Sequence, residues 1–203
     1  MKLDISIMRH SCAHLVAAAV AELYPKAKFG VGPMIENGFY YDIDFGVPIT
    51  EEDLQKIEDK AKDLQKQDLP FSRQEVTLDK AMEKFAQMGQ DYKVELLNDL
   101  KTKGTTKIND EELAEIGGNI DKVTIYQTGN FIDLCRGPHL KSTKEIGVFK
   151  LTKLAGAYWR GKSENPQLTR VYGVCFAKQK ELDDYLFLLE EAEKRDHRKL
   201  GKE

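Results

Sequence analysis

The sequence predicts an α+β fold with a largely antiparallel sheet and packed helices, followed by a C-terminal helix. Strand-like and helix-like segments are intermixed along the chain without strict alternation, which favours antiparallel pairing over a parallel βαβ sheet. Asn37-Gly38 lies between two apolar runs and is a strong hairpin signal. Residues 178–199 carry apolar side chains at helical spacing and end in a charged run.

The first part of the chain predicts a helix and a hairpin. Residues 8–23 show helical periodicity, and Pro25 follows the end of the pattern. Residues 29–35 are apolar but broken by glycines and a proline, which suits a strand with a bulge or a close backbone approach to a ligand. Residues 39–45 predict the return strand, whose alternation puts four side chains on one face: Phe39, Tyr41, Ile43 and Phe45.

The remaining elements follow from the same patterns. We expect further helices over 51–67, 78–88, 92–100 and 178–199. We expect further strands over 71–77, 122–127, 131–134, 147–155 and 168–177. Residues 101–119 are polar and contain glycine, so they predict a loop with room for one helical turn. Gly137-Pro138 excludes a regular helix through residues 135–139, which we expect to form a turn.

Composition is typical of a globular protein that works in a reducing cytoplasm. Of the 203 residues, 41% are hydrophobic and 32% are charged. No apolar run approaches membrane-spanning length, and the N-terminus has no signal-peptide pattern. Three unevenly spaced cysteines do not make a disulfide framework. The net charge is −3, but it is −7 over residues 1–140 and +4 over 141–203, so a nucleic-acid partner would need a local basic patch.

Two pairs of side chains far apart in the sequence are the main candidates for a functional site. His10 and His14 have three residues between them, which on a helix places both rings on one face about one turn apart. Cys135 and His139 have the same spacing. Imidazole nitrogen and thiolate sulfur suit a tetrahedral zinc, and the same groups can act as general bases toward water. We expect the fold to bring the two pairs together across one pocket.

Each pair also has a purely structural interpretation. A histidine on an apolar helix face is commonly a packed core residue, and an isolated Cys135 would more often be a buried thiol than a ligand. Cys12 lies two residues from each histidine, so we expect it to point to the opposite face and to be a small core residue. The first pair is not a zinc-peptidase motif, because residue 11 is Ser and no Glu follows the first histidine.

Several longer motifs resemble a known family. Three strings occur in this order: Arg9-His10-Ser11-Cys12-Ala13-His14, Gly38-Phe39-Tyr40-Tyr41-Asp42, and Asp133-Leu134-Cys135-Arg136-Gly137-Pro138-His139. With residues 155–161, residues 170–173 and the terminal helix, they resemble the editing domain of bacterial threonyl-tRNA synthetase, in the second additional domain family shared with alanyl-tRNA synthetase. The Cys-Arg-Gly-Pro-His form is similar to the threonyl branch and not to the alanyl editing domains.

The resemblance implies a domain organisation. Residues 1–177 would form the editing domain, an aminoacyl-tRNA deacylase. Residues 178–203 would form a linker helix that in this family leads to an aminoacylation domain, which this sequence does not contain. We therefore expect an excised editing fragment more than a free-standing editing protein. ATP binding, and homodimer formation through the absent domains, are expected only of the full-length parent.

The resemblance also implies an activity, which is hydrolysis of the ester in seryl-tRNA(Thr). Serine and threonine differ by one methyl group, and a single pocket gains only about 1–3 kcal/mol from such a contact, which is too little for faithful translation. The implied partner is the acceptor end of tRNA(Thr) carrying serine, with no membrane involved. The alternatives are a non-catalytic, zinc-organised tRNA-binding module and a free-standing hydrolase that acts in trans.

The resemblance assigns roles to particular residues. The family's site quartet matches His10, His14, Cys135 and His139. Lys93 would hold developing negative charge or the ribose, and Asp133 would receive the serine amino group. Tyr41 and Tyr126 would line the substrate pocket, while Gly32 and Pro33 would supply a close backbone wall. Without the resemblance, Lys93 is equally a surface helix lysine and Tyr41 an ordinary core residue.

Metal use remains a choice between two alternatives. The alanyl relatives hold zinc with an analogous quartet, and donor softness favours zinc here. The threonyl branch is described as editing without a bound metal, with His10 and His139 handling water. We expect no required cofactor, with zinc binding at the quartet left open.

Six cationic side chains are candidates for contacts with tRNA phosphates, and for each the alternative is an ordinary solvated surface charge: Arg136, Lys141, Lys153, Arg160, Lys162 and Arg170.

Overall fold

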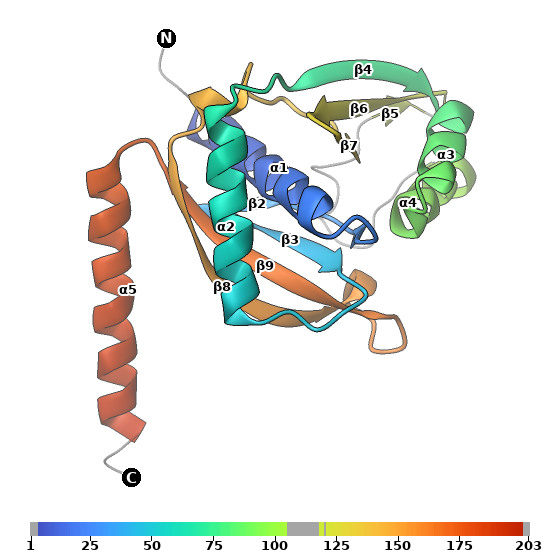
Figure 1. Cartoon of the computed structure of the whole chain (residues 1–203). Coiled ribbons are helices and arrows are strands. Elements are labelled where there is room, and N and C mark those ends of the chain that lie inside the picture. Colours follow the sequence, from blue (N-terminus) through green and yellow to red (C-terminus); the bar gives the residue numbers. More distant parts are fainter. Residues whose placement is uncertain (1–3, 105–117, 120, 201–203) are drawn as a thin grey trace.

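The computed structural model describes residues 4–104, 118–119 and 121–200 and confirms the predicted α+β class (Figure 1). The helices are α1 (Ile5–Leu23), α2 (Glu51–Lys66), α3 (Leu78–Gln87), α4 (Asp91–Lys103) and α5 (Gln179–Leu200). The strands are β1 (Lys28–Phe29), β2 (Met34–Ile35), β3 (Gly38–Asp44), β4 (Ser72–Thr77), β5 (Gly118–Asn119), β6 (Lys122–Thr128), β7 (Phe131–Leu134), β8 (Val148–Tyr158) and β9 (Gln167–Phe176). Short 3₁₀ turns lie at Thr143–Glu145 and Trp159–Gly161.

The described strands form two antiparallel sheets. One has the order β1-β3-β9-β8, with β2 also paired to β3. The other has the order β4-β6-β5, with β7 also paired to β6. Helix α1 lies between the two sheets, where it contacts β3 and β9 on one side and β6 and β7 on the other (Figure 1). Residues of α1 can therefore meet residues of β7 and the segment that follows it.

The hairpin prediction is confirmed, but its first strand is interrupted. The turn residue Asn37 has φ 65°, a left-handed conformation that asparagine tolerates well. The predicted strand over 29–35 is split into β1 and β2. The segment between them still follows β3, because Gly30 N donates to Asp42 O at 2.8 Å and Tyr40 N donates to Pro33 O at 3.2 Å. This irregular backbone is the predicted bulge.

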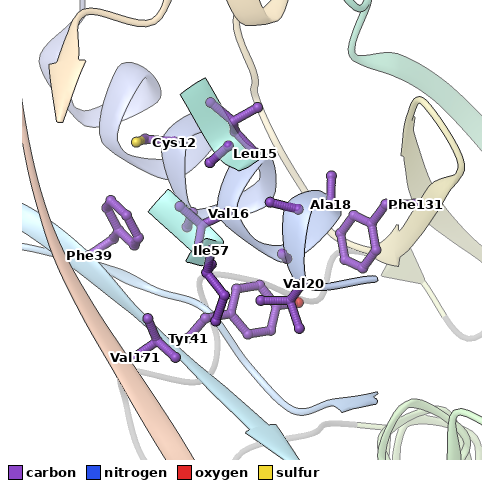
Figure 2. Close-up of a cluster of buried hydrophobic side chains, with 14 of the residues drawn as sticks. Cys12, Leu15, Val16, Ala18, Val20, Phe39, Tyr41, Ile57, Phe131 and Val171 are labelled. Atoms are coloured by element: carbon purple, nitrogen blue, oxygen red, sulfur yellow. The ribbon is translucent and has the colours of Figure 1, made fainter. Parts of the chain in front are cut away.

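Helix α1 starts three residues before the predicted boundary because a cap fixes its first turn. The Asp4 side chain accepts from Ser6 N at 3.0 Å. Every residue from Ser11 to Val20 is buried. Figure 2 shows Val16 of α1 close to Phe39 of β3, with Ile57 of α2 beside them. A helix that is apolar on most of its surface has to be enclosed by other elements, and here both sheets and α2 enclose it.

A second core lies between the four-stranded sheet and helices α3 and α4. Phe85 of α3 and Leu97 of α4 are fully buried there. Helix α4 runs to Lys103, so the predicted loop over 101–119 is wrong for its first three residues, which continue the helix. It is also wrong for residues 118–119, which form β5. The rest of that prediction lies outside the described residues.

Helix α5 packs on the outer face of β9 and then extends away from the body (Figure 1). Leu182 is buried against Val174 and Phe176, whereas Phe187 and Leu188 are more than 60% exposed, at 62% and 61%. Among the described helices, none combines the length and apolarity needed to cross a membrane. The proposed division of the chain at residue 177 stays a prediction.

Candidate functional site

The two predicted pairs meet in space. His10 and His14 come from α1, and Cys135 and His139 come from the irregular segment after β7. One donor atom from each of the four residues lies within 4.8 Å of the others. The His10 and His14 rings are 5.1 Å apart, so the three-residue spacing does place them on one helix face. Cys12 is buried on the opposite side, as predicted.

The thiol of Cys135 is at the centre of this quartet. Its Sγ lies 3.4 Å from His10 Nε2 and 3.3 Å from His139 Nε2, and it accepts from Gly137 N at 3.2 Å. Gly137 has φ 71°, and a Cβ there would lie 2.2 Å from the Tyr126 hydroxyl. The turn that returns the chain from Cys135 to His139 therefore requires glycine.

Ser11 also belongs to the site, and the sequence analysis did not assign it a role. Its Oγ lies 3.2 Å from His139 Nδ1 and accepts from Leu140 N at 2.9 Å. The hydroxyl is fully buried. Ser11 therefore ties α1 to the loop and fixes the orientation of the His139 ring, which Phe71 also stacks against at 5.2 Å. Only its place between two histidines could have indicated this.

Burial keeps the three imidazoles neutral near pH 7. It lowers the pKa of His10 to about 4, against the opposing effect of the Asp133 charge. Burial also holds the pKa of His14 well below its usual range, and the neighbouring His10 and Lys93 charges act in the same direction. The pKa of His139 is lowered in the same way by burial and by His14 and His10. Neutral rings can accept a proton, as a general base must.

A second, ionic cluster adjoins the quartet. Lys93 Nζ forms an ion pair with Asp133 Oδ1 at 2.6 Å, and both side chains are almost fully buried. Tyr41 donates a short hydrogen bond to Asp133 Oδ2, and Leu134 N donates to Oδ1 at 2.8 Å. His14 Nε2 lies 3.6 Å from Oδ2 and so connects the two clusters. Lys93 is thus a buried residue of the site and not a surface lysine.

A cavity of about 180 Å³ opens beside His10. Its wall consists of Ser6, Ile7, His10, Pro33, Met34, Gly137 and Pro138. This volume is below the ~300–1,000 Å³ typical of sites for drug-sized ligands, so the cavity suits a small group. The quartet therefore has an opening, and Pro33 does form part of its wall.

The other predicted pocket residues lie behind this cavity. Gly32 packs against Tyr41, because a Cβ at residue 32 would lie 2.2 Å from that ring. Tyr126 contacts the edge of the His139 ring at 4.4 Å. Together with Lys93 and Asp133, these residues surround the quartet without lining this cavity.

Two of the six candidate phosphate ligands are already engaged. Arg160 forms an ion pair with Asp99 at 2.5 Å, and its side chain is only 6% exposed. Arg170 forms a bidentate pair with Asp42 at 2.6 and 2.8 Å. The burial of Arg160 contradicts its prediction as a phosphate contact. Four of the candidates are exposed: Arg136, Lys141, Lys153 and Lys162.

Two distances within the quartet match those of a zinc site. Zinc bonds of ~2.0–2.3 Å place the corners of a tetrahedron roughly 3.5 Å apart. The Sγ of Cys135 lies at close to this distance from two imidazole nitrogens. One thiol and three imidazoles are also a chemically suitable donor set. If all four were ligands, no open coordination position would be left for a substrate.

Comparison with known proteins adds to this geometry. Residues 123–172 match the family described as the threonyl and alanyl tRNA synthetase second additional domain. Over 98% of its length the chain is 51% identical to a threonine–tRNA ligase of Citrifermentans bemidjiense and 50% identical to that of Anoxybacillus flavithermus. It is 49% identical to the threonine–tRNA ligase of Marinobacter nauticus. The chain spans about 28% of the length of these relatives.

The family match overlaps the donor cluster, because residues 123–172 include Cys135 and His139. Residues 123–172 are thus similar to the threonyl and alanyl tRNA synthetase second additional domain, and nearly the whole chain is similar to part of bacterial threonine–tRNA ligases. The resemblance to the threonyl branch is thereby confirmed.

Proposed function

We propose that this chain hydrolyses the ester that joins serine to the terminal ribose of tRNA(Thr). The observation that carries the proposal is the convergence of His10, His14, Cys135 and His139 beside a small open cavity, which His10 lines. The similarity to threonine–tRNA ligases and the family match support tRNA as the partner. ATP binding, homodimer formation and a cytoplasmic location stay predictions about the full-length parent.

In the proposed reaction the neutral His10 ring is the general base that accepts a proton from water. A water oxygen attacks the ester carbonyl carbon while His10 accepts a proton from that water. The carbon–oxygen bond to the ribose then breaks, and the proton passes to the departing ribose oxygen. Free serine and tRNA with a free hydroxyl result. His10 suits this role because it lines the cavity and because its lowered pKa keeps it unprotonated.

Asp133 retains one acceptor position for the substrate. Its two oxygens offer about four lone-pair sites. Lys93, Tyr41 and Leu134 N occupy three of them. In its predicted role Asp133 would accept from the serine ammonium group at the fourth position. The substrate would then have to reach beyond the cavity beside His10, because Asp133 does not line it. Lys93, held 2.6 Å from Asp133, would supply positive charge as the carbonyl oxygen becomes negative.

The size of the site supports rejection of threonine. One extra methyl group changes binding by only about 1–3 kcal/mol in an adaptable pocket, but a rigid wall excludes it more strongly. Pro33 and Pro138 give this cavity stiff walls. The exposed Arg136 directly precedes the wall residue Gly137, so it can contact a phosphate of the entering acceptor end.

The decisive experiment is a deacylation assay with the 203-residue chain. We expect release of serine from seryl-tRNA(Thr), with much slower release of threonine from threonyl-tRNA(Thr). His10→Ala and His139→Ala should abolish release, whereas exposed Lys66→Gln should retain it. Serine release no faster than the spontaneous background would refute catalysis by this domain.

A non-catalytic, zinc-organised tRNA-binding module is the second candidate, because the donor spacing fits the metal. It predicts one zinc per chain and loss of folding on chelation. Metal analysis combined with thermal melts, with and without EDTA, separates the candidates. Full deacylation by EDTA-treated, metal-free protein would exclude a required zinc.

A further inference from the structure

We propose that Trp159 and Arg160, at the tip of the β8–β9 hairpin, are positioning residues that hold helix α4 so that Lys93 reaches Asp133. The proposal rests on the proposed function, because it concerns the efficiency of that reaction. Neither residue touches the quartet or lines the cavity beside it. They act on the opposite side of the helix that carries Lys93.

Arg160 clamps two successive turns of α4. Its Nε lies 3.2 Å from Glu95 Oε1, and its Nη1 lies 2.5 Å from Asp99 Oδ2. Residues 95 and 99 are four apart and share one helix face, whereas Lys93 points away from that face. The contact of Nη1 with Asp99 is a hydrogen bond, whereas Nε meets Glu95 as an ion pair without hydrogen-bond geometry. Together the two contacts resist rotation of the helix about its axis.

Trp159 strengthens the same contact. Its indole Nε1 donates to Glu95 Oε2 at 3.0 Å. Its ring packs against Tyr92 with centroids 4.8 Å apart, and Tyr92 is the neighbour of Lys93. The Tyr92 hydroxyl in turn donates to Asp44 of β3 at 3.1 Å. Tyr92, which precedes Lys93, and Glu95, two residues after it, are therefore both held from outside the site.

The backbone of the hairpin tip shows that the side chain of Arg160 matters. Arg160 has φ 56°, a left-handed conformation that is uncommon for residues other than glycine. The side chain is nevertheless buried and paired with α4. A turn selected only for its shape would favour glycine or asparagine at this residue.

Helix α4 is also held by packing in the second core, by an ion pair of Lys101 with Asp79 of α3, and by contacts at its start. The buried Gln90 amide donates to Ala27 O at 3.0 Å and accepts from Phe29 N at 2.9 Å. Lys93 lies one turn from the start of α4, and its Nζ lies 2.6 Å from Asp133 Oδ1. The hairpin contact adds a polar restraint on the helix face that points away from Lys93.

The test compares Arg160→Gln and Glu95→Gln with Lys103→Gln, which removes another ion pair to Asp99 but no contact with the hairpin. In seryl-tRNA deacylation we expect kcat to fall about tenfold for the first two variants, with KM nearly unchanged and Lys103→Gln at wild-type rate. Arg160→Lys should recover part of the loss. In a Lys93→Met background, Arg160→Gln should cause no further loss, because both changes act through Lys93.

Two direct readouts separate failure of this proposal from failure of the proposed function. Trp159 is the only tryptophan in the chain, so its fluorescence reports docking of the hairpin on α4. The NMR signal of the Lys93 ammonium, in lysine-labelled protein, reports the ion pair even if the chain does not hydrolyse seryl-tRNA. We expect Arg160→Gln and Glu95→Gln to shift the Lys93 signal. An unchanged Lys93 signal, or additive losses of activity in the double variant, would overturn the positioning role. The Glu95 side chain is 47% exposed, so we expect Glu95→Gln to fold.

Discussion

The two halves of the site solve the problem of burying polar groups in opposite ways. The quartet gathers three imidazoles and a thiol, and burial keeps the imidazoles neutral. The adjoining cluster buries full charges, but Lys93 and Asp133 are paired and further hydrogen-bonded. Buried charge is tolerated when its partners are complete, and otherwise the group gives up its charge.

This difference separates the tasks of the two halves. Neutral rings beside an opening can exchange protons with water near pH 7. The paired charges of Lys93 and Asp133 provide a fixed electrostatic field. His14 lies between them, 3.6 Å from Asp133 and beside His10, so the two halves can influence each other.

Breaking the ionic half should have the largest effect on stability. Lys93→Met leaves Asp133 buried without its cation, and we expect the free energy of unfolding to fall by about 3–5 kcal/mol. Urea denaturation followed by circular dichroism measures it. The control is Lys62→Met, which also removes a lysine from a buried carboxylate, Glu58. There the lysine is 43% exposed and Lys150 remains as a partner, so the loss should stay below about 1 kcal/mol. Equal losses would contradict the contrast between the two pairs.

The neutral imidazoles of the quartet should make the free energy of unfolding depend on pH. The pKa of His10 is lowered to about 4 in the folded state, against an unfolded value near 6.5. Between these values the unfolded chain binds more protons, so stability is present above pH 6.5 and is lost as the pH falls toward 4. For His10 we expect a loss of about 2–3 kcal/mol between pH 7.5 and pH 4.5 in metal-free protein. His14 and His139 act in the same direction.

Urea denaturation at several pH values measures this loss, with His10→Asn as the comparison. The variant lacks the titrating ring, so its stability should depend less steeply on pH over the same range. Parallel curves for wild type and His10→Asn would show that His10 does not stay neutral in the folded state.

Much of the fold could be predicted because its elements carry local signals. The periodicity of α1 and the alternation of β3 place their apolar residues in one core. The differences concern where elements begin, end or are interrupted. Residues 29–35 form two short strands joined by an irregular segment that still bonds to β3, and the start of α1 depends on a cap at Asp4. Residues 101–103 continue α4 although they are polar, because helix ends need no apolar face.

The site could be predicted only in part for a related reason. The spacing of His10 and His14 is enough to predict that both rings lie on one helix face, since a helix repeats every 3.6 residues. Nothing in the local sequence indicates that Lys93 is buried against Asp133, because that contact joins α4 to β7. Ser11 and Arg160 are likewise defined by partners far away in the chain, at Leu140 and Asp99.

A smaller effect should follow from changing the turn that carries the neutral half. Gly137→Ala adds a Cβ that would lie 2.2 Å from the Tyr126 hydroxyl, at a residue with φ 71°. We expect a loss of about 2 kcal/mol in unfolding free energy and a displaced His139. Gly46→Ala is the matched control, because Gly46 has φ 68° but nothing within 4 Å of an added Cβ. For Gly46→Ala we expect the unfolding free energy to fall by only ~1 kcal/mol, which is the cost of placing alanine in a left-handed backbone conformation. Similar losses for both variants would mean that Tyr126 moves aside freely.

The smallest effect concerns the serine that joins α1 to the loop. Ser11→Ala removes the acceptor of Leu140 N and the partner of His139 Nδ1. We expect a loss of about 1 kcal/mol in unfolding free energy, since one buried amide loses its partner. Exposed Ser142→Ala serves as the control and should change stability by less, because water can replace its bond to Asp68. The sharper measurement is the NMR spectrum of the His139 ring nitrogens, since Ser11 holds that ring in one orientation beside Cys135. A His139 spectrum that is identical in wild type and Ser11→Ala would show that Phe71 and Tyr126 orient the ring without the hydroxyl.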